Sequence, residues 1–209
     1  MASKTGYFDV VFSPAETMKR DKRSVVDGIT RLATFGAIVG AVMGLLAAGA
    51  LAVAGAVAAA FVPLAFLLAG LGMIAALFAV VALAFSFAVC AVAFNFAETA
   101  VFFVCAKLLG GKGNFSRHFY LNALINTTYP LVALIALMAA TLLLFIPVLG
   151  PAAFAVAFTF LALYCVYLRS LAVKETHGLN WVKSVLAVLL VPVILVLFLA
   201  SAAAAALLH

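Results

Sequence analysis

The sequence predicts an all-α fold, a polytopic transmembrane bundle of five helices, and its composition and charge distribution carry this prediction. Of the 209 residues, 69% are hydrophobic and only 9% are charged, with a mean hydropathy of +1.37. A soluble domain carries about 25% charged residues. A chain this apolar cannot cover its surface with polar groups, so lipid must be the solvent for much of it.

Long apolar blocks hold the predicted spans. Residues 32–106 contain one charged residue, Glu98, whereas residues 118–168 and 184–209 contain no Asp, Glu, Lys or Arg. A helix crosses the hydrocarbon core in about 20 residues. The first block therefore has room for two or three spans, the second for two and the third for one.

Proline and glycine divide these blocks because neither continues a helix easily. Pro63, followed by Gly70 and Gly72, interrupts the first block, and the segment Ile146–Pro151 interrupts the second. The apolar linker 61–72 also fits a re-entrant or interfacial piece. The predicted spans are residues 32–60, 73–107, 120–145, 152–173 and 182–206.

The basic residues select five spans rather than six. With five, the N-terminal segment and the loops 107–118 and 169–183 lie on one side and hold all 12 Lys and Arg residues. Six spans would move Lys107, Lys112 and Arg117 to the other side. Because positive loops stay in the cytoplasm, the N-terminus is predicted inside and the C-terminus outside.

Residues 1–31 form a predicted cytoplasmic segment ahead of the transmembrane domain 32–209. Ser13-Pro14-Ala15-Glu16 resembles a capping box and predicts a short amphipathic helix from Pro14 to about Lys22, and a second start signal precedes Val25. The basic residues of this segment suit anionic headgroups or a partner protein, although the favoured interpretation is a simple juxtamembrane anchor. The candidate contacts are Lys19, Arg20, Lys22, Arg23, Lys112 and Arg117.

The first predicted span carries Gly36, Gly40 and Gly44, a doubled GxxxG pattern on one helix face. Such a face lets another helix backbone approach closely. Packing against another span of the same chain is favoured over homodimerisation.

A polar cluster is predicted near the cytoplasmic side of the bundle. Glu98 is the one charged residue deep in a predicted span, about 13 Å from Lys107 along the helix. Asn95 lies one turn away, and the next span carries a polar face at matching depth. The predicted cluster comprises Asn95, Glu98, Asn122, Asn126, Tyr129 and Arg169.

Two interpretations of this cluster stay open. A carboxylate in a bilayer costs about 2.5–3.5 kcal/mol on insertion scales, so it needs a partner, water or a proton. A cation site, a titrating gate or a headgroup pocket would each use Glu98. Interhelical bonding, with Glu98 protonated or paired to Arg169, is slightly favoured because only one acid is present.

No catalytic constellation is expected, and neither a metal nor a cofactor is predicted. The histidines are scattered, and the three cysteines lie in apolar stretches without metal-ligand spacing. Gly110–Gly113 lacks the spacing of a phosphate loop. The net charge of +6 comes from residues that lie between the apolar blocks, so nucleic acid is not an expected partner.

Four short motifs, in this order, resemble the Yip (Ypt-interacting protein) superfamily of five-span membrane proteins. They are Phe12-Ser13-Pro14, Leu108–Phe115, Tyr129-Pro130-Leu131 and Thr176–Lys183. The resemblance implies a five-span bundle with a cytoplasmic N-terminus and supplies no catalytic residues. Eukaryotic members are associated with Rab-type GTPases and vesicle traffic, but this short, Ala-rich chain looks like a prokaryotic-type member, which implies the cell membrane.

Two functions follow as hypotheses. The first is a non-enzymatic membrane scaffold or adaptor that acts through the bilayer, its basic face and a homo-oligomer or another membrane protein. The second is a small-solute or ion transporter or channel that uses the cluster around Glu98. A closed cluster with Glu98 bonded to its neighbours would favour the first, whereas a cavity open to water would favour the second.

Overall fold

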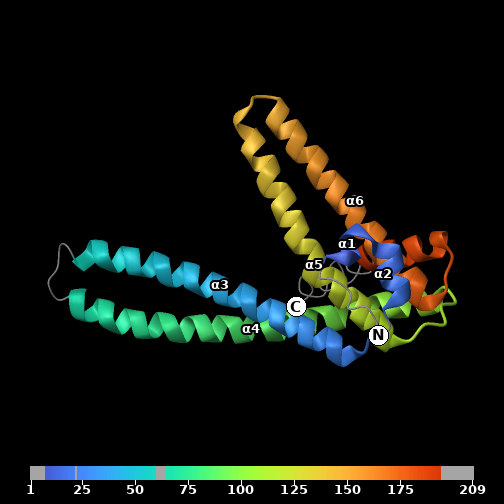
Figure 1. Cartoon of the computed structure of the whole chain (residues 1–209), viewed down its shortest axis with the longest axis horizontal. Helices are drawn as coiled ribbons and strands as arrows, with labels where there is room; N and C mark the ends of the chain where they lie inside the picture. The colour runs from blue at the N-terminus through green and yellow to red at the C-terminus, as the bar shows by residue number, and fades with distance from the viewer. Residues whose placement is uncertain (1–7, 22, 60–64, 194–209) are drawn as a thin grey trace, which may run out of the picture. The chain divides into compact units, whose positions relative to one another are not determined.

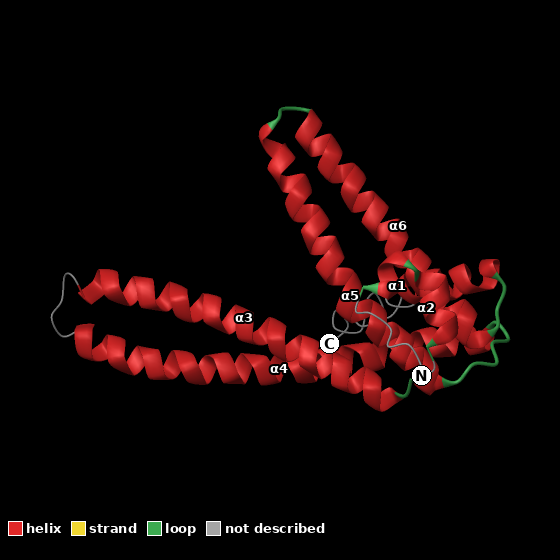
Figure 2. Cartoon of the chain, in the orientation of Figure 1, coloured by secondary structure: helices red, strands yellow, loops and turns green. Residues whose placement is uncertain are grey.

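The computed structural model describes residues 8–21, 23–59 and 65–193, and the regular elements in these ranges are all helical (Figure 2). The chain divides into two compact units, residues 29–94 and residues 1–28 with 95–209. The elements are α1 (Asp9–Phe12), α2 (Pro14–Arg20), α3 (Val25–Ala59), α4 (Ala65–Leu108), α5 (Phe115–Leu142), η1 (Leu143–Phe145), α6 (Leu149–His177) and a last helix, Trp181–Val193.

The unit of residues 29–94 is a helical hairpin formed by most of α3 and the first part of α4 (Figure 1). The glycine face of α3 lies directly against the α4 backbone. A Cβ added at Gly36 would stand 2.6 Å from the Phe87 carbonyl oxygen, and one at Gly44 would stand 2.7 Å from Val80 Cα. The glycines therefore serve a close contact within the chain.

The helices that hold the first two spans begin ahead of the predicted spans. α3 begins at Val25, as the second start signal predicts, and continues into the first span. The Asp27 carboxylate accepts from the Ser24 backbone N–H at 3.0 Å, as a helix start signal does. α4 begins at Ala65 and continues through Gly70 and Gly72, so the predicted break at these glycines is wrong. Surrounding lipid offers no partner to a freed backbone group, which favours continuing the helix. Residues 61–64 of the predicted linker lie outside the described residues.

The second unit contains the α5–α6 hairpin, which turns through η1 (Figure 1). Pro130 lies inside α5 without ending it, and α6 begins at Leu149, three residues before the predicted span. Gly178 in the left-handed conformation (φ 66°) ends α6, as glycine commonly does at the C-terminus of a helix.

Four helical segments in the described residues are long and apolar enough to cross a membrane: Val25–Val57, Ile74–Leu108, Phe115–Phe145 and Leu149–His177. The predicted fifth span, 182–206, begins as the helix Trp181–Val193, and its remainder lies outside the described residues. These helices have the length and composition of those in a multi-pass membrane protein, whereas a total of five spans stays a prediction.

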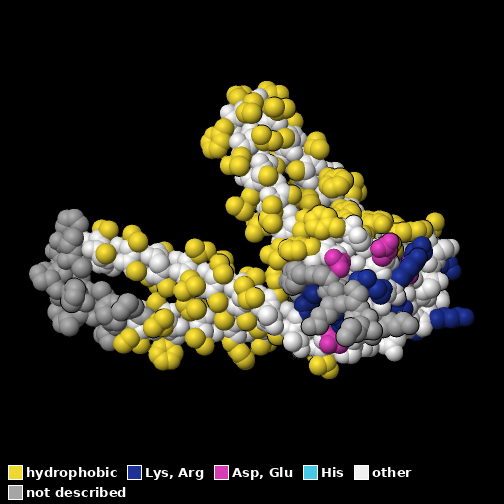
Figure 3. All heavy atoms as spheres, viewed as in Figure 1, with side chains coloured by type: hydrophobic (Ala, Val, Ile, Leu, Met, Phe, Trp, Pro, Cys, Tyr) yellow, Lys and Arg dark blue, Asp and Glu magenta, His cyan; other side chains and the backbone are white. Residues whose placement is uncertain are grey.

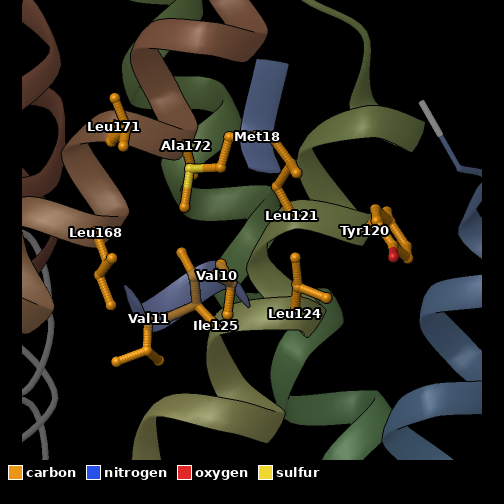
Figure 4. Packing of buried hydrophobic residues seen from close by; sticks show 10 residues of the cluster. All are labelled: Val10, Val11, Met18, Tyr120, Leu121, Leu124, Ile125, Leu168, Leu171 and Ala172. Atoms are coloured by element: carbon orange, nitrogen blue, oxygen red, sulfur yellow. The ribbon is translucent and has the colours of Figure 1, made fainter. Parts of the chain in front are cut away.

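The N-terminal segment packs into the α5–α6 unit instead of standing apart from it. Val10 and Met18 are fully buried, and Val11 is nearly so. Figure 4 shows the apolar cluster that they enter, which comprises Val10, Val11, Met18, Tyr120, Leu121, Leu124, Ile125, Leu168, Leu171 and Ala172.

Polar contacts fix this docking at three points. Tyr164 Oη donates to the Val11 carbonyl, Arg117 Nη2 donates to the Met18 carbonyl at 3.0 Å, and Tyr120 Oη donates to Asp21 Oδ2 at 3.1 Å. The capping box expected at Ser13 is not formed, because the Ser13 side chain makes no cap hydrogen bond. α1 precedes this position, and its last turn supplies the Asp9 carbonyl to the Ser13 N–H. We define α1, α2 and Asp21 as the N-terminal clasp.

Met18→Ala is expected to lower the free energy that holds the clasp against α5 and α6 by about 2 kcal/mol, because the change removes a fully buried side chain and leaves a cavity. Hydrogen exchange of the α2 amides in detergent should accelerate accordingly. Phe12→Ala is the matched control, since Phe12 is 75% exposed and its loss should leave these rates unchanged. Equal exchange in Met18→Ala and in the unmodified protein would show that the clasp is not held by this contact.

Candidate functional site

The predicted polar cluster draws on three helices of the second unit. α4 supplies Asn95 and Glu98, α5 supplies Asn122 and Asn126, and α6 supplies Arg169. The short connection between α4 and α5 makes these two helices antiparallel neighbours, which sets Glu98 opposite the two α5 asparagines. The structure therefore places five of the six predicted residues together.

Glu98 is saturated with bonds to its neighbours. Its Oε1 atom forms an ion pair with Arg169 Nη1, and its Oε2 atom accepts from Asn122 Nδ2 at 3.0 Å and Asn126 Nδ2 at 2.6 Å. The Glu98 and Arg169 side chains are only 10% and 20% exposed. Both oxygens of the carboxylate are thus occupied by protein donors.

The amides extend these contacts across the helices. Asn126 Nδ2 also donates to Asn95 Oδ1 at 3.0 Å, and Asn95 Nδ2 donates to the Phe119 carbonyl at 3.4 Å. Arg169 Nη2 donates to Asn126 Oδ1 at 3.3 Å. α4 and α5 each donate and accept in this network, and α6 donates to both of them through Arg169, an arrangement that fixes the register of the three helices.

Tyr129 does not join the cluster. Its hydroxyl donates to the Leu161 carbonyl on α6, and its ring packs against the apolar cluster that receives the clasp. The i, i+4, i+7 spacing placed it on the same face as Asn122, but two turns farther along α5 its hydroxyl reaches the backbone of α6 instead of the cluster. The tyrosine ties α5 to α6 at a separate point.

Thr99 is an additional member of the cluster. It is fully buried, and its Oγ1 accepts from Asn122 Nδ2 at 3.1 Å. In the sequence, the position of Thr99 beside Glu98 indicates a hydroxyl near the cluster, but it does not indicate that Asn122 is its partner.

A buried histidine pair lies one turn from the cluster. His118 and His177 are 1% and 3% exposed, and His118 Nδ1 lies 3.2 Å from His177 Nε2. The Phe102 ring stacks on the His118 ring. The Arg169 guanidinium carbon lies over the same Phe102 ring, 5.4 Å from its centroid, so Phe102 contacts both the histidine pair and the polar cluster. The four-residue spacing between His118 and Asn122 places both on one face of α5 and could have identified His118 as a neighbour of the cluster. Nothing in the sequence links His118 to His177, which is 59 residues away.

The glycine-rich turn covers this histidine pair. A Cβ at Gly111 or Gly113 would stand 2.9 Å or 2.8 Å from His177 Nδ1, so both positions need glycine. Gly111 N–H donates to the Ala106 carbonyl at 2.8 Å, and Lys112 N–H donates to the His177 carbonyl at 3.1 Å. Because these donors are already used, the turn closes helix ends and does not cradle a phosphate.

The six candidate headgroup or partner residues do not form one patch. Arg117 is half-buried under the clasp, and Arg23 lies 3.5 Å from Asp21 and over the Tyr120 ring. Lys22 lies outside the described residues. Lys19, Arg20 and Lys112 are exposed. Figure 3 shows charged side chains gathered around the N-terminal end of the second unit, whereas its α5–α6 hairpin is covered with hydrophobic ones.

A family model, the Yip1 domain, matches residues 8–203, which is nearly the whole chain. No curated protein and no solved structure matches the chain significantly. The match covers all the helices described above, and it includes the clasp, the polar cluster and the histidine pair.

Proposed function

We propose that this chain, which belongs to the Yip1 domain family, is a non-enzymatic membrane scaffold or adaptor. The observation that carries the proposal is the state of Glu98. Both of its oxygens bind protein groups, its cationic partner is on another helix, and its side chain is 10% exposed. A carboxylate used in this way locks helices together and has no free oxygen for a solute.

The proposed working surface is the outer side of the clasp, in the cytoplasm of a cell whose plasma membrane holds the bundle. Lys19 and Arg20 are exposed on α2, while the opposite side of the same helix buries Met18. A partner that displaces the clasp would therefore act on α5 through Arg117, which bonds to α2, and on α6 through Tyr164, which bonds to α1. This connection gives an adaptor a route from its cytoplasmic face to its membrane helices.

The test is photo-crosslinking in native membranes with a photoreactive residue in place of Lys19 or, as the control, in place of Leu134. Leu134 is 56% exposed in the apolar part of α5. We expect a discrete protein adduct from position 19 that Arg20→Glu weakens, and only lipid adducts from position 134. Lipid adducts alone at both positions would contradict the adaptor.

The alternative is a small-solute or ion transporter that uses the cluster around Glu98. Flux measurements in proteoliposomes decide between the two, with Glu98→Gln as the variant. The scaffold predicts flux no greater than in protein-free liposomes for both proteins. Flux that the unmodified protein supports and Glu98→Gln abolishes would favour the transporter.

A further inference from the structure

Four aromatic rings form a continuous series on the surface of α6 and the helix that follows it. Phe160 and Tyr164 are nearly parallel at 4°, Tyr164 and Tyr167 meet at 22°, and Tyr167 and Trp181 meet at 16°, with centroids 5.7–6.1 Å apart. Phe160 is 65% exposed, and Tyr167 and Trp181 are 39% and 41% exposed. We call these four residues the aromatic ladder.

The ladder runs from an apolar region to a charged one. Phe160 lies in the middle of the span Leu149–His177, where lipid is the solvent, about 10 Å along the helix from Tyr167. At the other end, the Lys174 ammonium lies 4.7 Å from the Trp181 ring centroid. Tyrosine and tryptophan prefer this boundary because their rings are apolar and their polar tips reach water.

The charged end carries an excess of cations. Lys183 lies two residues after Trp181, and its Nζ atom donates to the Leu109 carbonyl at 3.3 Å. This contact brings the end of α4, with Lys107, and the following turn, with Lys112, to the same end of the unit. The acidic residue of this region is Glu175. Four lysines against one carboxylate favour a negatively charged ligand.

The polar tips of the ladder are available to such a ligand. Within the described residues, neither the Tyr167 hydroxyl nor the Trp181 indole N–H has a hydrogen-bond partner, whereas the Tyr164 hydroxyl is used by the Val11 carbonyl. Two donors and a lysine ammonium at the head of an exposed aromatic strip match a phosphodiester with an acyl chain below it.

We propose that the aromatic ladder and Lys174 form a binding site for an anionic phospholipid of the surrounding bilayer. The phosphate lies at Lys174 and the indole N–H of Trp181, and an acyl chain lies along Tyr164 and Phe160. The site is separate from the exposed cations of the clasp, and it does not depend on whether the protein is a scaffold or a transporter.

Trp181 is the only tryptophan of the chain, so its fluorescence reports on this site alone. The test reconstitutes the full-length protein in phosphatidylcholine vesicles in which a minor fraction of the lipid carries brominated chains. The brominated lipid is either phosphatidylglycerol or phosphatidylcholine, at equal mole fraction. Bromine quenches an indole that it contacts, so the ratio of the two quenching curves gives the preference for the anionic headgroup.

We expect the brominated anionic lipid to be preferred, and Lys174→Gln to reduce this preference about fivefold, since one lysine near a membrane surface contributes about 1 kcal/mol. Lys174→Arg should retain it. Lys19→Gln, which removes an exposed cation of the clasp, is the matched control and should leave it unchanged. Circular dichroism and the emission maximum confirm that each variant is folded.

Three outcomes would overturn the proposal. Equal quenching by both lipids would show ordinary bilayer contact without selection. A preference that survives in Lys174→Gln would place the selecting charge elsewhere. Reversal of the quenching by soluble glycerol phosphate, but not by chloride of the same ionic strength, would show a site for soluble phosphates instead of a lipid.

Discussion

Arg169→Met is expected to lower the free energy of unfolding by about 3–5 kcal/mol, because it removes the cationic partner of a carboxylate that stays buried among three helices. Methionine roughly conserves the length of the side chain, so lost volume contributes little. The two asparagine amides remain on Glu98 but carry no net charge to balance it. Titration with a denaturing detergent, followed by circular dichroism, measures the change.

Lys19→Met is the control for this substitution. It also replaces a cation by methionine, but Lys19 is exposed, so the effect should stay within about 0.5 kcal/mol. An equal loss in both variants would mean that the total positive charge, and not the pair with Glu98, stabilises the bundle.

The second large effect is expected for Gly40→Leu, with a loss of about 3 kcal/mol from the hairpin of α3 and α4. A Cβ at this position would stand 2.7 Å from Ala84 Cα and would also collide with the Leu83 carbonyl oxygen. These are backbone atoms, which cannot turn aside as a side chain does, so the two helices must separate along the contact.

Gly49→Leu is the matched variant on the same helix, because nothing lies within 4 Å of a Cβ at that position. It should be neutral or slightly stabilising, since leucine favours the helix more than glycine does. Detergent titration of both variants compares them directly. Equal stability of Gly40→Leu and Gly49→Leu would show that the close contact between α3 and α4 contributes no stability.

The polar cluster was predictable from the sequence because few assumptions connect its residues. The short turn 109–114 makes α4 and α5 antiparallel, and equal counts from that turn bring Glu98 level with Asn126. Arg169 was the available cation at the same end of α6. The cost of a carboxylate in lipid then predicts that these groups meet.

Other features of the fold could not be predicted, because one sequence pattern is compatible with two different structural environments. The apolar residues around Met18, flanked by basic ones, suit a membrane surface as well as a protein groove, and only the fold shows that they fill the groove of α5 and α6. Tyr129 shared a helix face with Asn122, yet its hydroxyl reaches Leu161. Gly70 and Gly72 resembled a break, although a helix in lipid continues through glycine because its backbone has no other partner.

A double-mutant cycle of Glu98 and Arg169 tests most directly the claim that their pair locks α4, α5 and α6 together. Unfolding is measured for the unmodified protein, Glu98→Gln, Arg169→Met and the double variant in one detergent. The structural role predicts that each single variant is destabilised, and that the double variant recovers about 2–3 kcal/mol of the summed losses, since it leaves no charge alone. Additive losses, or a Glu98→Gln variant as stable as the unmodified protein, would contradict it and would mean that the acid is kept for a function.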